Sequence, residues 1–157
     1  MKKVVKMNNN KIIGKVHSSM YHQIQQTGMA VPVQVLMDLG CLAASDYENW
    51  RLGKVDYLER VCKVNLHKLS FIMKEVRAYA RKNDLKPSLK FYRQGGRKGK
   101  KSAVRLRFSK SGNENIECSY ATHYISEKWM DKRKKLTGKL VGEKGGESDG
   151  RDRTHPI

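Results

Sequence analysis

The sequence predicts an α+β fold that is mainly helical and carries one β-hairpin. Residues 66–82 repeat their apolar side chains every three or four positions, which is typical of an amphipathic helix. After Pro87 the apolar residues alternate instead, which is typical of half-buried strands. A glycine-rich basic loop at residues 95–102 separates two such alternating segments, so we expect a hairpin across residues 88–109.

The chain of 157 residues has the common size of one domain. We expect a basic, partly ordered segment at residues 1–29, a single globular domain at 30–130 and a basic, glycine-rich, disordered tail at 131–157. The tail is poor in apolar residues from Gly138 onward, so burial cannot offset the entropy that it would lose on ordering.

Three short helices are expected before the long one. Pro32 suits the first turn of a helix that Gly40 would end. Ser45 and Glu48 have the spacing of a capping box, Gly53 can end that turn, and the capping-box spacing recurs at residues 56–59.

Asn65 is expected to cap the long helix at residues 66–82. The apolar residues of this helix gather on one arc, and the opposite arc carries a polar and basic stripe. The stripe consists of His67, Ser70, Lys74, Arg77 and Arg81. Helices normally present charge to water, but a basic hairpin beside this stripe favours a binding surface.

Alternation in the hairpin assigns its two faces. We expect one set of side chains to face the core: Leu89, Phe91, Val104, Leu106 and Phe108. We expect the alternate set to face solvent: Lys90, Tyr92, Arg105 and Arg107. The loop adds four cations at the tip: Arg97, Lys98, Lys100 and Lys101. Beyond the hairpin we expect a short amphipathic helix through Ile116, Tyr120 and Tyr124, and a last helix from Ser126.

Charge indicates the class of partner. The chain has 33 Lys and Arg against 15 Asp and Glu, a formal net charge of +18. Self-repulsion of this size disfavours a compact state unless a polyanion neutralises it, so nucleic acid is the first partner that we expect and an anionic membrane is a weaker alternative.

Other classes are disfavoured. No apolar run approaches the roughly 18 residues of a membrane span, and the first residues lack the apolar stretch of a secretory signal, so we expect a cytoplasmic protein without membrane attachment. Cys41, Cys62 and Cys118 are widely separated and form no CxxC pair, which argues against a disulfide framework and a zinc site. We therefore expect buried thiols, no metal and no cofactor.

Residues 58–70 resemble the core of a helix-turn-helix, and a basic hairpin after it is the order of a winged helix-turn-helix. Glu59 and Lys63 depart from the family pattern, which usually has a small residue and glycine there. The resemblance implies duplex DNA as the ligand. It implies groove and phosphate contacts from the stripe and Lys68, and phosphate contacts from the four loop cations.

Two alternatives remain open at the level of sequence. Tyr92 among Lys90, Arg105 and Arg107 would also suit stacking on an unpaired base, which keeps single-stranded nucleic acid and RNA possible. His123, with Glu117 and an arginine, is a weak candidate for metal-independent cleavage of RNA. Since no recognised catalytic spacing surrounds it, we expect a binding protein rather than an enzyme.

A second resemblance is carried by residues 46–59, by Phe108-Ser109-Lys110-Ser111-Gly112 and by Tyr120-Ala121-Thr122-His123-Tyr124. These motifs resemble a group of small bacterial proteins without an assigned function, over about residues 31–125. The resemblance supports one domain and implies no activity. Within it, Tyr47, Trp50 and Tyr57 could form a site for a protein partner of a regulatory or defence system, although aromatic residues at such positions usually belong to the core.

Overall fold

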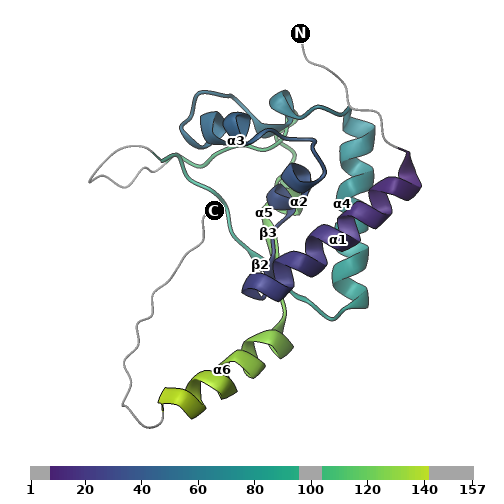
Figure 1. Cartoon of the computed structure of the whole chain (residues 1–157). Helices are drawn as coiled ribbons and strands as arrows, with labels where there is room; N and C mark the ends of the chain where they lie inside the picture. Colours follow the sequence, from purple (N-terminus) through teal and green to yellow (C-terminus); the bar gives the residue numbers. More distant parts are fainter. Residues whose placement is uncertain (1–7, 96–103, 142–157) are drawn as a thin grey trace.

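The computed structural model describes residues 8–95 and 104–141 of the chain, with side chains to residue 136 (Figure 1). It is an α+β fold in which helices surround a small antiparallel sheet. In chain order, the described elements are α1 (Asn9–Thr27), β1 (Met29–Ala30), α2 (Pro32–Asp38), α3 (Ala44–Arg51), the 3-10 turn η1 (Leu58–Val61), α4 (Leu66–Lys82), β2 (Lys86–Leu89), α5 (Glu114–Ala121), β3 (Thr122–Ile125) and α6 (Glu127–Val141).

The packed core begins earlier in the chain than the predicted boundary at residue 30. Helix α1 buries Ile12, Val16, Met20 and Ile24 in the same core as α4. These residues recur at positions i, i+4, i+8 and i+12, a helical period that the surrounding polar residues obscure in the sequence. The Asn8 side chain accepts a hydrogen bond from the Lys11 amide and caps α1.

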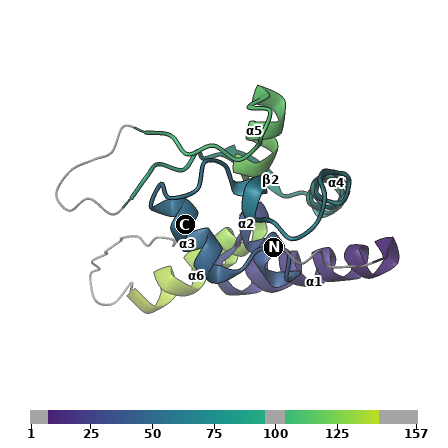
Figure 2. The same cartoon turned by 90° about the horizontal axis from the view of Figure 1, so that it is seen from above.

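Helix α4 has the predicted bounds and the predicted cap. The Asn65 side chain accepts a 2.9 Å hydrogen bond from the Lys68 amide. Figure 2 views α4 nearly along its axis, with α1 on one flank and α5 on the other. Because α1 covers one flank and the core covers the inner face, α4 keeps an exposed outer face and a second flank that faces α5.

Several short elements differ in detail from their predictions. Helix α2 begins at Pro32 as expected, and Gly40 after it has φ 82°. Helix α3 begins at Ala44 without a side-chain cap, so the expected Ser45 cap is wrong. A single 3-10 turn, η1, occupies the place of the first helix of the expected helix-turn-helix.

The sheet has the order β1-β3-β2, and both pairs are antiparallel. Its central strand β3 was predicted as the end of a helix that includes Tyr124. The helix ends at Ala121 because residues 122–125 all pair with β2, Tyr124 and Ile125 pair with β1 as well, and Thr, Tyr and Ile favour strands.

The hairpin is shorter than predicted and faces differently. Residues 86–89 pair with β3, and Arg93 forms only an isolated bridge with Arg105. Leu106 and Phe108 are buried as expected, whereas Leu89 and Val104 are about half exposed. The arms of the hairpin pack beside α3: the Gly95 amide donates to the Arg51 carbonyl at 2.9 Å. Figures 1 and 2 both place these arms on the opposite side of the molecule from α4.

An aromatic cluster joins the motifs of the second resemblance. Trp50 is fully buried and packs against Tyr92 and Phe108, and its indole donates a 2.8 Å hydrogen bond to the Arg107 carbonyl. Phe108 stacks on Tyr120 with ring centroids 5.5 Å apart. The motifs therefore meet in one core, which explains their composition structurally.

Glu117 on α5 organises the loop that follows Phe108. Its buried carboxylate accepts hydrogen bonds from the Phe108 and Ser109 amides and from the Ser109 hydroxyl. The Ser109 hydroxyl also accepts from the Gly112 amide. A buried carboxylate needs such donors, so Glu117 fixes the loop against α5.

Helix α6 continues past the predicted domain boundary at residue 130. The Ser126 hydroxyl accepts a hydrogen bond from the Trp129 amide, which confirms the predicted start. The Trp129 ring covers Gly28, where an added Cβ would lie 2.3 Å from it and where φ is 79°. Glycine is therefore required at position 28.

Candidate functional site

The outer face of α4 carries the predicted stripe. His67, Ser70, Lys74, Arg77 and Arg81 are all exposed, and they share one side of the helix. The one acidic residue of α4, Glu75, is only partly exposed and lies on a different side at 100° per residue. We call these five residues the α4 stripe. It presents three permanent cations without an acid among them.

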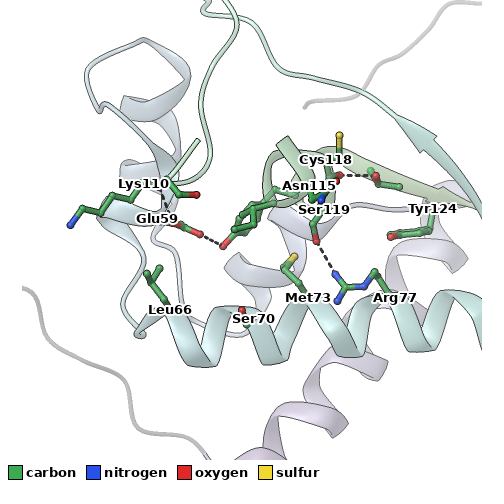
Figure 3. A pocket seen from close by; sticks show the side chains of 14 residues that line it. Glu59, Leu66, Ser70, Met73, Arg77, Lys110, Asn115, Cys118, Ser119 and Tyr124 are labelled. Atoms are coloured by element: carbon green, nitrogen blue, oxygen red, sulfur yellow. Dashed lines mark hydrogen bonds between the residues drawn. The ribbon is translucent and has the colours of Figure 1, made fainter. Parts of the chain in front are cut away.

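A groove lies directly beside the α4 stripe, between α4 and α5, with a volume of about 950 Å³ (Figure 3). Two stripe residues, Ser70 and Arg77, line it. Its full lining is Glu59, Leu66, Ser70, Met73, Arg77, Lys110, Ser111, Asn115, Ile116, Cys118, Ser119, Tyr120, Thr122 and Tyr124.

Both walls of this groove expose an apolar side chain. Leu66 on α4 is 55% exposed and Ile116 on α5 is 40% exposed. The buried side chains of Met73 and Tyr120 lie beneath them. The apolar faces of both helices, which include Leu66 and Ile116, were expected to face the core. At 100° per residue, however, Leu66 lies at the edge of the apolar arc of α4, where α5 does not cover it.

Polar contacts connect residues that line the groove at two separate points. The Arg77 guanidinium on α4 donates a 2.9 Å hydrogen bond to the Ser119 hydroxyl on α5. Farther along, the Tyr120 hydroxyl donates a 2.7 Å hydrogen bond to Glu59, and the Lys110 amide donates to the same carboxylate at 3.0 Å. Figure 3 shows both sets of contacts. The first contact joins α4 to α5, and the second joins α5 to η1 and to the segment after Phe108.

The pKa values of two tyrosines that line the groove reflect the charges around it. Burial raises the pKa of Tyr120 far above the ordinary value, and the neighbouring Glu59 carboxylate raises it further. Burial also raises the pKa of Tyr124, while Arg77 and Arg81 oppose that rise. The two arginines of the α4 stripe therefore act on the groove as positive charges.

The other predicted contact residues that the structure describes make contacts of their own or are exposed elsewhere. The Lys68 ammonium donates a 3.0 Å hydrogen bond to Asn9 on α1. Lys90 is exposed in the segment after β2. Arg105 lies over the Phe91 ring and pairs with Glu114 at 3.5 Å, and the Arg107 guanidinium donates to the Ser109 and Lys110 carbonyls. The loop cations Arg97, Lys98, Lys100 and Lys101 lie outside the described residues.

Tyr92 was predicted to face solvent, and that prediction is wrong. Its side chain is only 4% exposed, and its hydroxyl lies 3.3 Å from Nε2 of His123. The irregular backbone after β2 breaks the strict alternation on which the prediction rested. Tyr92 therefore cannot stack on an unpaired base.

Two further candidates are also part of the core. His123 is 4% exposed on the central strand β3, so a substrate phosphate has no access to it in this structure. Trp50 is fully buried, which removes the anchor of the partner site expected at Tyr47, Trp50 and Tyr57. Cys41 and Cys62 are buried as expected, whereas Cys118 is partly exposed in the groove.

Comparisons with known proteins do not assign this chain to a family. Searches against protein-family models, curated proteins and solved structures found no match to this chain. Among the described residues, no group of three His, Cys, Asp or Glu side chains could hold a metal ion. No helix in the same part of the chain has the length and apolar character needed to cross a membrane.

Proposed function

We propose that this chain is a nucleic-acid-binding protein and that the α4 stripe contacts the phosphate backbone, with duplex DNA as the first candidate. The supporting observation is the exposure of Lys74, Arg77 and Arg81 on one face that carries no acid. The net charge of +18 supports the same class of ligand, because released counterions drive the binding of basic proteins to polynucleotides.

The dimensions of the stripe suit a duplex. From His67 to Arg81 the helix rises about 21 Å at 1.5 Å per residue. A duplex carries one charge per roughly 1.7 Å of its axis, so several phosphates fall within reach of the stripe. Arg77 can also pair bidentately with a guanine edge, whereas Lys74 supplies a point charge.

A winged helix-turn-helix is the finer form of this proposal. Its support is the order of elements along the chain: a short turn at η1, the capped helix α4, and then a basic segment. The position of the hairpin arms, on the opposite side of the molecule from α4 in Figures 1 and 2, does not support it. The loop at residues 96–103, which would form the tip of the wing, lies outside the described residues. The proposal therefore rests on α4, and the loop cations remain a prediction.

RNA is the competing ligand class. The stripe alone favours neither duplex, because phosphate contacts carry no sequence or sugar information. The test is fluorescence anisotropy of the full chain with labelled duplex DNA, single-stranded DNA and duplex RNA of equal length. We expect binding to duplex DNA to be the tightest. Tighter binding to either other polymer would move the proposal to that ligand, and binding to none of them at low salt would reject it.

A further inference from the structure

The apolar groove between α4 and α5 is not explained by contacts with a duplex. Phosphates and base edges call for donors and cations. The groove instead exposes Leu66 and Ile116 on facing walls, above buried Met73 and Tyr120. Two large apolar side chains on opposite walls of one groove are typical of a protein docking surface.

The groove has the length and shape to hold a helix. Its α4 wall runs from Leu66 to Arg77, which is about 16 Å at 1.5 Å per residue, or about three helical turns. The opposite side is formed by Lys110 at one end, by Asn115 and Ser119 of α5 in the middle and by Tyr124 at the other end (Figure 3), and α5 itself crosses α4 rather than running beside it (Figure 2). An amphipathic helix can lay its apolar face into such a groove with side chains at i, i+3 or i+4, and i+7.

Unpaired bases fit this groove less well. Stacking needs an exposed aromatic face, and the two tyrosines of the lining are only 2% and 7% exposed, at Tyr120 and Tyr124 respectively. The exposed side chains are aliphatic, and aliphatic anchors suit a peptide.

The positive charge beside the groove favours a negatively charged partner. Arg77 lines the α4 wall, and Lys74 and Arg81 continue the stripe along its rim, while Lys110 lies at the end near Glu59. The Glu59 carboxylate is held by the Tyr120 hydroxyl and the Lys110 amide. An occupant with acidic residues flanking its apolar face would therefore be attracted, and a basic one repelled.

The chain offers no such segment of its own outside the described part. Residues 1–7 contain three lysines and no acid. Residues 142–157 contain acids, but Ile157 is their one large apolar residue. The exposed part of α6, with Lys132, Arg133, Lys134 and Lys135, is basic, which also disfavours a second copy docking through that helix.

We infer that the α4–α5 groove binds an acidic amphipathic helix of a different protein, with apolar side chains between Leu66 and Ile116 and carboxylates along Lys74, Arg77 and Arg81. The groove adjoins the α4 stripe and shares Arg77 with it. Occupation of the groove would therefore place acidic side chains where the proposed nucleic-acid contacts lie.

The test is a selection of displayed random peptides on the full chain, with peptides of about 16 residues so that they exceed the groove by a turn or more. The tightest selected peptide is then synthesised with a fluorescent label and titrated against three variants. Ile116→Asp places a charge in the groove at an exposed position in the first turn of α5, where an acid suits the helix dipole. Leu66→Asp does the same on α4. Leu136→Asp is the matched control, because Leu136 is 58% exposed on α6 and does not line the groove.

We expect the selected peptides to combine acidic residues with apolar residues at helical spacing. We expect Ile116→Asp and Leu66→Asp to weaken binding by about tenfold or more, as for a buried anchor, and Leu136→Asp to leave it unchanged. Peptides without acids, or peptides that bind all three variants equally, would contradict the inference. So would oligothymidine that binds in place of any peptide and is lost in Ile116→Asp.

Duplex DNA titrated against the same variants separates this inference from the proposed function. Ile116→Asp should retain DNA binding, since Ile116 is not in the α4 stripe. A variant that loses peptide binding and keeps DNA binding therefore locates the peptide in the groove. If the wild-type chain binds no DNA, the proposed function fails, and the peptide titrations still test the groove independently.

Discussion

The Arg77 guanidinium on α4 lies 2.9 Å from the Ser119 hydroxyl on α5 and donates a hydrogen bond to it. The contact turns the central cation of the α4 stripe toward the groove. Arg77 is consequently shared between the two surfaces, whereas Lys74 and Arg81 are exposed on the stripe and do not line the groove.

Because of this contact, substitutions of Arg77 and of Ser119 should have different effects on DNA binding. Arg77→Ala should weaken binding to duplex DNA, by about 1 to 3 kcal/mol if Arg77 contacts a base. Ser119→Ala releases the guanidinium without removing its charge, so affinity should stay the same or rise slightly. Anisotropy titrations of both variants measure this difference. Equal losses in the two variants would show that the Arg77–Ser119 contact supports folding rather than binding.

Lys74 and Arg81 should act mainly through charge. Each change to alanine should reduce the slope of log affinity against log salt by about 1, since one phosphate contact is removed. Lys54→Ala is the control, because Lys54 is exposed after α3, in a part of the molecule that Figures 1 and 2 place away from α4. An unchanged slope in both stripe variants, or an equal change in the control, would mean that binding does not depend on α4.

Glu117 should be a large contributor to stability. Glu117→Gln places an amide N–H₂ against the donors of Phe108 and Ser109. The free energy of unfolding, measured in urea, should therefore fall by at least about 2 kcal/mol. The control is Glu114→Gln, an exposed acid on the same helix. Its surface ion pair with Arg105 is worth about 1 kcal/mol or less. A loss in the control as large as that in Glu117→Gln would contradict the role given to the buried carboxylate.

Alkaline pH should unfold the protein through groups whose burial favours the neutral form. Burial raises the pKa of Cys41 from 9.0 to about 11, and burial raises the pKa of Tyr92 and Tyr120 far above 10.0. Because these folded-state pKa values exceed the unfolded ones, stability is lost as the pH rises: for Cys41 between about pH 9 and pH 11, and for Tyr92 and Tyr120 from about pH 10 upward. Tyrosinate absorbance and circular dichroism should therefore change together above about pH 10. Full ionisation of all seven tyrosines with unchanged circular dichroism would contradict this.

The sequence predicted the long helix and its exposed face well. The period of the apolar residues in α4 and the Asn65 cap are local signals, and the structure has the helix at the predicted residues. The bounds of α2 and the start of α6 follow from equally local signals at Pro32 and Ser126.

The errors come from tertiary packing. Tyr92 is buried because Trp50, Phe108 and His123 surround it, and none of these neighbours is close in sequence. Strand β3 forms because β1 and β2 pair with it from distant parts of the chain. Likewise, the groove depends on where α5 packs beside α4, so Leu66 and Ile116 could not be distinguished from core residues.

Charge reversal on α4 tests the central claim most directly. The double variant Lys74→Glu/Arg81→Glu changes two exposed residues and should fold like the wild-type chain by circular dichroism. We predict that the wild-type chain binds labelled duplex DNA at low salt, with affinity that falls steeply as salt rises, and that the double variant loses nearly all of this binding. The same affinity and the same salt dependence in the folded double variant would contradict the claim that the α4 stripe is the nucleic-acid contact.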